Sequence, residues 1–282
     1  MKNNHPETWH VGTSFDPYDD SQDLSLEHIM NVGFQCIELV LSGTEMNLNA
    51  EGLGRRFDGI MRSAHDLGLN VWSVHLPFGD IWDISTLDNT KRQKILNVHY
   101  DWLDWVGRWN VSHVIIHPSF EPIDSALRGE HLETCQKSLN KLADYADKLG
   151  IQVCVECLPR TCLGNQSLEI EKLISDHGTL GVCCDVNHLL HEQPEAFIAQ
   201  IGTRIRTVHM SDYDGVDEKH WLPGQGIINW STVLQALVQA DYQGPFMFEV
   251  SYENADTLMN SWHHILRDYK VQISYGEDKC SF

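Results

Sequence analysis

Carboxylate and imidazole side chains collect at one kind of place in this sequence, the ends of short apolar runs. Seven of these runs carry such groups at or near their carboxyl ends, and the residues are Glu38, His75, His117, Glu156, Asp185 with His188, His209 and Glu249. A single histidine at such a place is more often a hydrogen-bonded core residue than a ligand. Many unpaired charges on apolar strands, however, would each cost several kcal/mol to bury. A metal cation supplies the countercharge, so the whole set predicts a metal site.

Four of these residues form an oxygen-rich set that suits a hard divalent cation, namely Glu156, Asp185, His209 and Glu249. Such ligands favour Mn²⁺, Co²⁺, Mg²⁺ or Zn²⁺ over copper or an iron–sulfur cluster. Open positions on the ion could take two sugar oxygens, and the ion would stabilise the enediolate formed when a neighbouring C–H proton leaves. Glu156 and Glu249, one on each side of the substrate, could remove and return that proton. The expected chemistry is proton transfer at a carbon alpha to a carbonyl.

These residues need strands whose ends meet, and the sequence contains eight apolar runs of strand length, bounded by Gly, Pro, Asp or Asn. The runs are Trp9–Ser14, Cys36–Leu41, Asn70–Pro77, His113–Pro118, Gln152–Cys157, Gly181–His188, Arg204–Asp212 and Gly244–Ser251. Between them lie stretches of helical spacing, including Phe57–Leu67, Lys91–Trp109, Glu130–Leu149, Trp230–Ala240 and Ala255–Tyr269. This alternation predicts an α/β fold, a single (β/α)8 TIM barrel domain over residues 1–282. A doubly wound sheet is the alternative, but Val11-Gly12-Thr13-Ser14 is not the glycine-rich turn that such a sheet needs.

Alternation along the strands predicts which side chains share a face with the ligands. The inward faces should hold Cys154, Cys183, Ile205, Thr207 and Met247. The outward faces, toward the helices, should hold Val155, Cys157, Phe246 and Phe248.

The composition limits the classes of partner. The chain has 282 residues, with 20 Lys and Arg against 40 Asp and Glu, a formal net charge of −20. A surface that acidic repels phosphate backbones, so we expect no nucleic-acid partner. No run approaches the roughly 20 apolar residues of a membrane span, and the first residues have no signal-peptide character, so we expect no membrane partner and a cytoplasmic location. Several of the eight cysteines lie in strand-like runs and are expected to be reduced core residues.

Residues outside the strands leave alternatives open. The polar, glycine-rich stretch from His209 to Asn229 is either a solvated loop or a lid whose Lys219, His220 and Trp221 close over the mouth and exclude water. Arg160 is either a surface residue or a contact for an anionic substrate group. Trp82 and Trp221 lie in predicted loops and could stack on a sugar, whereas the helical spacing of three other tryptophans predicts core packing. These are Trp102, Trp105 and Trp109.

Seven strings, in this order, resemble the xylose isomerase-like TIM barrel superfamily, the sugar phosphate isomerase/epimerase family. They are VHLP, IHPS, VEC, CDVNH, VHMSDYDG, HWLPGQG with IINW, and FMFEV. That superfamily includes sugar isomerases and epimerases, inosose dehydratases, hydroxypyruvate isomerases and the endonuclease IV type of phosphodiesterase. The resemblance covers nearly the whole chain and implies a metal-dependent barrel, while it leaves the reaction open.

Within the ketose 3-epimerase branch, the resemblance implies that the two glutamates of the metal site are the acid/base pair. The implied metal ligands are Glu156, Asp185, His209 and Glu249. His188 matches a substrate-binding residue. This chain departs from that branch at Cys162, where the epimerases carry a further substrate-binding glutamate, and at Lys219 and His220, which stand in place of an arginine.

The endonuclease branch uses nine ligands for three zinc ions, and the resemblance matches eight of them. These are His75, His117, Glu156, Asp185, His188, His209, His220 and Glu249. Glu218 stands where that branch has aspartate. The segment after Glu156 reads Cys-Leu-Pro-Arg-Thr instead of a glycine-containing loop, and the chain lacks the basic surface of a DNA-processing enzyme.

The sequence thus favours a divalent-metal-dependent isomerase or epimerase acting on a sugar, keto-sugar or cyclitol. The predicted catalytic residues are Glu156 and Glu249. The predicted substrate-binding residues are His75, His117, His188, Lys219 and His220. The alternatives are a lyase or dehydratase of the same barrel, an endonuclease IV-like zinc phosphodiesterase, and a sugar-binding barrel without catalysis. The expected partner is a small carbohydrate, and the resemblance also suggests a homo-oligomer.

Overall fold

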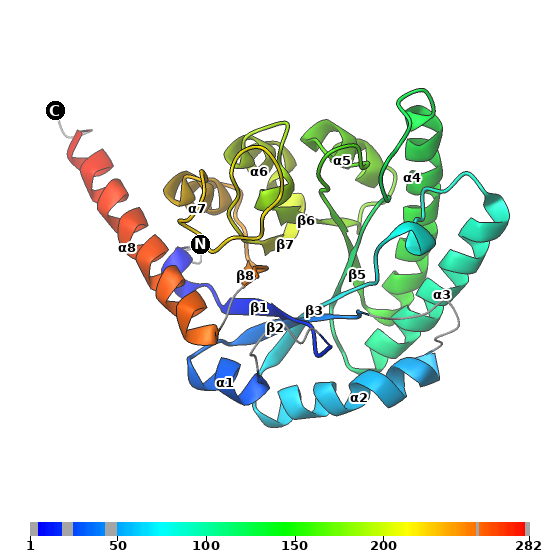
Figure 1. Cartoon of the computed structure of the whole chain (residues 1–282), viewed down its shortest axis with the longest axis horizontal. Coiled ribbons are helices and arrows are strands. Elements are labelled where there is room, and N and C mark those ends of the chain that lie inside the picture. The colour runs from blue at the N-terminus through cyan, green and yellow to red at the C-terminus, as the bar shows by residue number, and fades with distance from the viewer. Residues whose placement is uncertain (1–4, 19–24, 43–49, 252–253, 280–282) are drawn as a thin grey trace.

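Eight parallel strands form one sheet that curls into a barrel in the computed structural model, which describes residues 5–18, 25–42, 50–251 and 254–279 (Figure 1). The strands are β1 (Val11–Phe15), β2 (Cys36–Val40), β3 (Asn70–His75), β4 (His113–Ile116), β5 (Gln152–Glu156), β6 (Gly181–Asp185), β7 (Ile205–His209) and β8 (Phe246–Phe248). Their order is β7-β6-β5-β4-β3-β2-β1-β8. The two edge strands meet at an isolated bridge between Met210 and Phe248, just beyond the end of β7. The (β/α)8 TIM barrel fold is therefore confirmed.

In the described part of the chain, eight α-helices surround the sheet (Figure 1). They are α1 (Leu26–Asn31), α2 (Ala50–Asp66), α3 (Asn89–Arg108), α4 (Arg128–Ala146), α5 (Ser167–Ile174), α6 (Pro194–Ile201), α7 (Trp230–Gln239) and α8 (Ala255–Lys279). Helix α8 runs ten residues beyond the predicted Ala255–Tyr269. Among the described side chains of this helix, Tyr269 is the last buried apolar one, and Ile273, one turn later, packs against the core only partly buried, so the hydrophobic spacing weakens beyond Tyr269.

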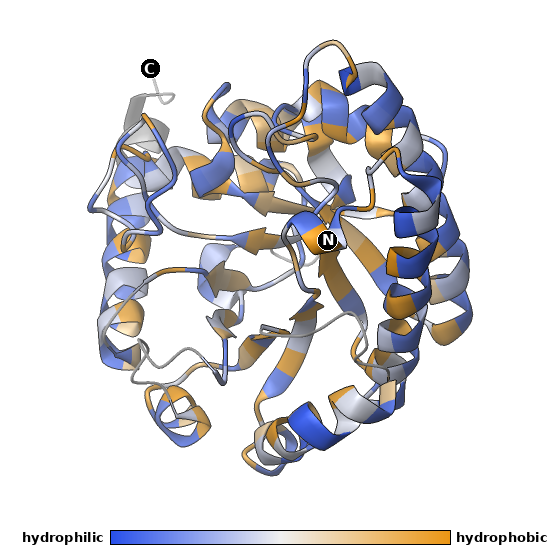
Figure 2. Ribbon diagram, turned by 45° about the vertical axis from the view of Figure 1, so that its right-hand side comes forward, coloured by the Kyte–Doolittle hydropathy of each residue, from blue (hydrophilic) through white to orange (hydrophobic). Residues whose placement is uncertain are grey.

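The side chains divide into two layers, as the strand alternation predicts. Cys154 and Cys183 pack with Ile115 in a small cluster of their own inside the barrel. The much larger core lies between the strands and the helices, and it includes the predicted Val155, Cys157, Phe246 and Phe248. In Figure 2 the strands are mostly coloured as hydrophobic, whereas the helices carry both colours.

The prediction for Ile205 is wrong, because this residue packs in the large outer core. Val182 pairs with Ile205, but the next residue, Cys183, pairs with Thr207, so Arg206 is an extra residue in β7. A bulge of this kind breaks the alternation of faces along a strand. The period-two pattern therefore holds for the end of β7 that carries His209 but not for its beginning.

The tryptophans mainly serve the outer core. Trp102 and Trp105 are fully buried, as predicted from their helical spacing. Trp82, expected to be free to stack on a sugar, is instead 5 % exposed and packs on Trp102 with ring centroids 4.8 Å apart. It lies in a short 3₁₀ helix, Asp80–Trp82, that turns the chain back toward α3. Trp82 is therefore a core residue.

Two further features concern the chain as a whole. All seven described cysteines are free and buried, in agreement with the expectation of reduced core thiols. Within residues 5–18, 25–42, 50–251 and 254–279, none of the helices combines the length and the apolar character needed to cross a membrane.

His99 is a buried, uncharged residue of this core. It is fully inaccessible, lies beside Trp82 and Trp102, and donates a hydrogen bond from Nδ1 to the Ile95 carbonyl oxygen at 2.8 Å. Burial lowers the pKa of His99 to about 4. The folded protein therefore keeps this imidazole neutral at a pH at which the unfolded chain would protonate it.

We expect His99 to make the protein less stable in mild acid. Below pH 6.5, His99 binds a proton in the unfolded chain but stays neutral in the folded chain. The free energy of unfolding therefore falls as the pH falls toward 4. This residue should account for a loss of about 2 kcal/mol between pH 7 and pH 5. Urea unfolding at both pH values, with His99→Leu for comparison, measures it. The same loss in both proteins would contradict this role.

Candidate active site

The predicted site residues converge because strand ends position them. His75, Glu156, Asp185 and His209 are the last residues of β3, β5, β6 and β7. Two others, His117 and Glu249, directly follow β4 and β8. The carboxyl ends of parallel barrel strands open at one mouth, so sheet hydrogen bonds fix the relative positions of these side chains.

The four predicted metal ligands do lie together. One donor atom from each of Glu156, Asp185, His209 and Glu249 falls within 4.8 Å of the others. The Nδ1 atom of His209 is 3.0 Å from a Glu249 oxygen, 3.3 Å from a Glu156 oxygen and 3.9 Å from an Asp185 oxygen. Ligands at 2.0–2.2 Å from one ion are separated by about these distances. The geometry suits one divalent cation.

The electrostatics of this group also favour a cation. Oδ2 of Asp185 and Oε2 of Glu249 are buried and accept no hydrogen bond from the described residues, although imidazoles lie near both. Burial, with the neighbouring carboxylates of Glu249 and Glu156, raises the pKa of Asp185 to about 7 against the pull of His188. Burial also disfavours ionisation of Glu249, but His209 outweighs it and holds the pKa of Glu249 well below its usual range. These residues therefore fit a bound divalent ion.

Glu156 lies at the centre of the site because its two oxygens face different neighbours. Oε2 is 3.1 Å from Nε2 of His75 and 3.0 Å from Nε2 of His117. Oε1 is 3.3 Å from Nδ1 of His209 and 3.4 Å from Nδ1 of His188. Burial opposes the charge of Glu156, but His117 and His209 hold its pKa well below the usual value. Glu156 is therefore an ionised carboxylate shared by the metal-ligand group and two further imidazoles.

His188 connects the ligand group to the loop that follows β7. Its Nδ1 atom is 3.0 Å from the Cys157 carbonyl oxygen, and its Nε2 atom is 3.1 Å from a Glu218 oxygen. Burial lowers the pKa of His188, but the carboxylates of Asp185 and Glu218 outweigh burial and raise it to about 10. His188, Glu218 and His220 also come within ligand distance of one another, as do His75, His117 and Glu156.

Arg160 holds together three loops around the mouth. Its Nε, Nη1 and Nη2 atoms donate to Glu121, Asp217 and Glu218 at 2.7, 2.7 and 2.8 Å. The guanidinium is thus occupied by three carboxylates of the protein. This arrangement does not support the interpretation of Arg160 as a free contact for an anionic substrate group, and it shows a role that the sequence pattern did not reveal.

The loop after β7 is anchored from within by Asp212. This fully buried carboxylate accepts hydrogen bonds from the N–H groups of Tyr213, Gly224 and Ile228 and from the indole of Trp230, at 2.8–3.1 Å. A Cβ at Gly226 would lie 2.2 Å from the Tyr213 carbonyl oxygen, so glycine is required there. The loop is therefore an ordered element packed on the barrel.

These side chains border a cavity of about 220 Å³ over the ligand group. Of the predicted substrate-binding residues, four line the cavity: His75, His117, His188 and His220. Lys219 does not, because its ammonium lies 3.4 Å from Asp214. Trp221 is not among the lining residues either. The sequence missed the aromatic wall, in which Phe78 stacks on His117 with centroids 4.6 Å apart and Phe120 lies nearby.

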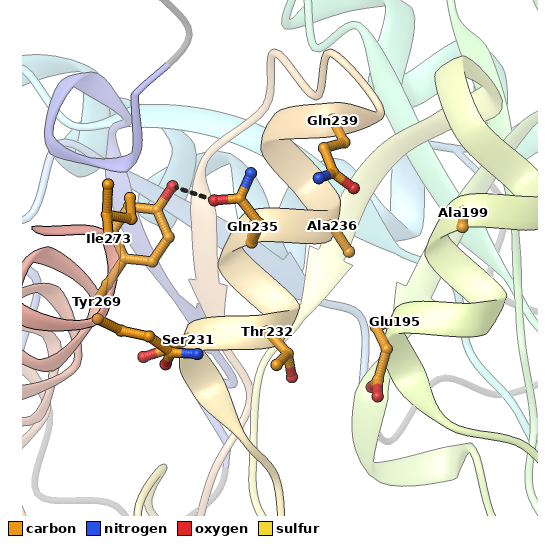
Figure 3. A pocket seen from close by; sticks show the side chains of 10 residues that line it. Glu195, Ala199, Ser231, Thr232, Gln235, Ala236, Gln239, Tyr269 and Ile273 are labelled. Carbon is orange, nitrogen blue, oxygen red and sulfur yellow. Dashed lines mark hydrogen bonds between the residues drawn. The ribbon is translucent and has the colours of Figure 1, made fainter. Parts of the chain in front are cut away.

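A second cavity, of about 440 Å³, lies on the outside of the barrel between α6, α7 and α8 (Figure 3). Its lining is largely Gln, Ala, Ser and Thr, with Tyr269 donating a hydrogen bond to Gln235 at 3.2 Å. Glu195 is its only carboxylate-bearing residue among those the structure describes there. It is larger than the cavity at the strand ends, yet it contains no acid/base pair.

Comparison with known proteins agrees with the TIM barrel fold. A family model described as xylose isomerase-like TIM barrel matches residues 26–269. The chain is 27% identical over 240 residues to the uncharacterized protein MJ1311 of Methanocaldococcus jannaschii, covering 82% of this chain and 79% of that protein. It is 26% identical over 212 residues to a ketose 3-epimerase of Arthrobacter globiformis, covering 70% and 71%. A D-tagatose 3-epimerase-like crystal structure superposes with a TM-score of 0.77 at 23% identity, covering 94% and 98% of the two chains.

We predict that the metal-free protein binds about one Mn²⁺ or Co²⁺ per chain, because one set of four ligands suits one ion. Asp185→Asn removes the one carboxylate of the four-ligand group whose pKa its surroundings raise, so its negative charge is the least stabilised by the protein. It should weaken binding by more than the roughly 10–100-fold typical of losing an outer-shell partner. Isothermal titration after chelator treatment measures both quantities, with the exposed Asp176→Asn as the matched control. Two or three ions per chain would mean that the other two groups also bind metal.

Proposed function

The chain belongs to the xylose isomerase-like TIM barrel family, and on this premise we propose that it is a divalent-metal-dependent sugar isomerase or epimerase. The observation that carries the proposal is the placement of Glu156 and Glu249. Both carboxylates border the cavity and also belong to the four-ligand group. Two carboxylates that share a cation site and a substrate cavity suit proton transfer at a carbon next to a carbonyl.

The protein residues have distinct parts in this mechanism. A cation held by Glu156, Asp185, His209 and Glu249 would supply positive charge next to the substrate carbonyl. One glutamate accepts the proton from carbon while the other, on the opposite side of the substrate, returns a proton to the same or the adjacent carbon. The low pKa keeps the accepting glutamate ionised at neutral pH, and the other glutamate must hold a proton when the carbon proton leaves, so that the pair carries one proton before and after the step.

The imidazoles and the apolar wall would hold the sugar in place. His75, His117, His188 and His220 all line the cavity. Hydroxyl groups of a sugar both donate and accept hydrogen bonds, as imidazoles do. Phe78 and Phe120 give the cavity apolar faces that would pack on C–H groups of the ring or chain. A volume of about 220 Å³ corresponds to a small carbohydrate.

The phosphodiesterase alternative receives less support from the same residues. It would need His188, Glu218 and His220 as a further metal group, yet Glu218 is already paired with Arg160 and His188. The net charge of −20 also gives no basic surface for a nucleic acid. A lyase or dehydratase would begin with the same proton removal, so the product distinguishes it from an isomerase.

Replacing each glutamate separately tests the acid/base pair. We expect Glu249→Gln and Glu156→Gln to lower turnover by roughly 10²–10⁴-fold, the usual contribution of a general acid or base. The measurement follows proton exchange by NMR in D₂O over a panel of ketopentoses and ketohexoses, with metal content determined for each variant. If the reaction is an epimerisation, each variant should still exchange the epimer whose C–H faces the remaining glutamate.

Glu130→Gln, on the exposed side of α4, is the matched control and should leave exchange unchanged. Full turnover by Glu249→Gln with metal bound would remove Glu249 from the mechanism. Dehydrated products in place of isomers would favour the lyase alternative. The absence of exchange by the wild-type protein with every ketose of the panel would favour a binding protein.

We further infer that the substrate has no phosphate at the end that faces the mouth. Arg160 is the only lining residue with a permanent positive charge in the described part of the cavity, and three carboxylates already occupy it. A phosphate dianion would have to displace Glu121, Asp217 or Glu218 and would meet their negative charges. An uncharged hydroxyl group meets no such repulsion.

A matched pair of substrates tests this inference. We expect kcat/KM for a free ketohexose to exceed that for its 6-phosphate by at least about tenfold, which corresponds to roughly 1.4 kcal/mol. Asp217→Asn removes one of the negative charges around Arg160 and should reduce the preference, whereas Asp176→Asn should not. A preference for the phosphorylated sugar would contradict the inference while leaving proton transfer intact.

The remaining sequence-based expectations stay predictions. They are a single domain over residues 1–282, a cytoplasmic location, the absence of nucleic-acid partners, and a homo-oligomeric state.

A further inference from the structure

Glu38 is a buried carboxylate that the proposed reaction does not use. It is the middle residue of β2, is fully inaccessible, and does not line the cavity at the strand ends. The pairing of β2 with β3 shifts register between Ile37 and Glu38, and the shift places Glu38 opposite Ser73. A charge at this depth needs specific partners to be tolerated.

Glu38 has two such partners. Its Oε2 atom accepts a hydrogen bond from the Ser73 hydroxyl at 2.6 Å. Its Oε1 atom lies 2.9 Å from Nε2 of His209. The two atoms approach at an angle outside hydrogen-bond geometry, but neither has another hydrogen-bond partner among the described residues. The Ser73 contact thus turns the other carboxylate oxygen toward His209.

The two nitrogens of His209 therefore face different surroundings. Nδ1 points to the metal-ligand group, 3.0 Å from Glu249 and 3.3 Å from Glu156. Nε2 points away from that group, to Glu38. A neutral imidazole carries one proton, and only the nitrogen without the proton has a lone pair for a metal.

We propose that Glu38 is a positioning residue that keeps the proton of His209 on Nε2 and so presents the Nδ1 lone pair to the cation. This inference rests on the metal site of the proposed function. Without the Glu38 charge, a proton on Nδ1 would be favoured by the carboxylates of Glu249 and Glu156, and it would compete with the metal for the same position. An outer carboxylate also makes a ligating imidazole more basic and fixes its ring orientation.

The surroundings of Glu38 support its pairing with His209. Cys154 and Cys183, which pack with Ile115 inside the barrel, lie near enough to feel the charge of Glu38 and carry no countercharge. His75 is the other imidazole near enough to feel the charge of Glu38, and its ring stacks against that of His209 at 5.8 Å. The Nε2 atom of His75, however, is directed to Glu156 at 3.1 Å. Glu38 is thus available to His209.

The test measures metal affinity and the His209 tautomer, without using turnover. Glu38→Gln keeps the shape of the side chain and removes its charge. We expect it to weaken Mn²⁺ binding, measured by isothermal titration, by roughly 10–100-fold. In the ¹⁵N-histidine NMR spectrum of the Zn²⁺-loaded protein, wild-type His209 should carry its proton on Nε2. Glu130→Gln should match the wild type in both measurements.

Ser73→Ala provides a second variant that keeps the Glu38 charge but removes the hydroxyl that orients it. Ser73→Ala should weaken Mn²⁺ binding several-fold, which is a smaller effect than that expected for Glu38→Gln. If Glu38→Gln does not fold, Ser73→Ala alone tests the proposal. Unchanged metal affinity in a folded Glu38→Gln, or in Ser73→Ala when it serves alone, would overturn the proposal. Wild-type protein that binds Mn²⁺ but exchanges no sugar proton would refute the proposed function and leave this test intact.

Discussion

Mutual repulsion among carboxylates held inside one end of the barrel is the constraint on which the site depends. Glu156, Asp185 and Glu249 bring oxygens within 4.8 Å of one another, and Glu38 lies on the other side of His209. At such separations, and away from bulk water, like charges repel by several kcal/mol. The fold offsets this repulsion with imidazoles placed between the carboxylates. A divalent cation would complete the balance at the point where two buried oxygens accept no hydrogen bond from the described residues.

The barrel can maintain this arrangement because the charged groups stand on strands, whereas loops only cover them. Six of the strand-borne groups are the last residue of a strand or the next residue, so their spacing follows from parallel pairing. Besides the contact through His188, the covering loops have anchors outside the ligand group. Asp212 gathers four donors within the loop after β7, and Arg160 ties that loop to its neighbours. Substrate-facing loops can therefore differ while the metal group stays in place.

The sequence was sufficient for the strands and for the convergence of the four predicted ligands, because apolar runs of this length are distinctive and parallel strand ends meet in a barrel. It was not sufficient where tertiary contacts decide. Trp82 was misplaced because the loop after β3 folds back onto the core, and Ile205 because a bulge in β7 is invisible to a period-two pattern. The aromatic wall and the pairing of Arg160 depend on loops that meet only in the folded chain. Lys219 had an equally suitable partner in Asp214.

In the proposed reaction, Glu156 would couple the metal end of the site to the substrate end. One of its oxygens belongs to the ligand group, and the other faces His75 and His117 on the cavity wall. Since both oxygens share a single negative charge, imidazoles that turn toward a sugar hydroxyl leave more of that charge for the cation and for the departing proton. Binding of substrate to the histidines would thus strengthen the base that acts on it. On this proposal, the groups at the strand ends would determine the reaction, and the loop residues that line the cavity would determine which substrate binds there.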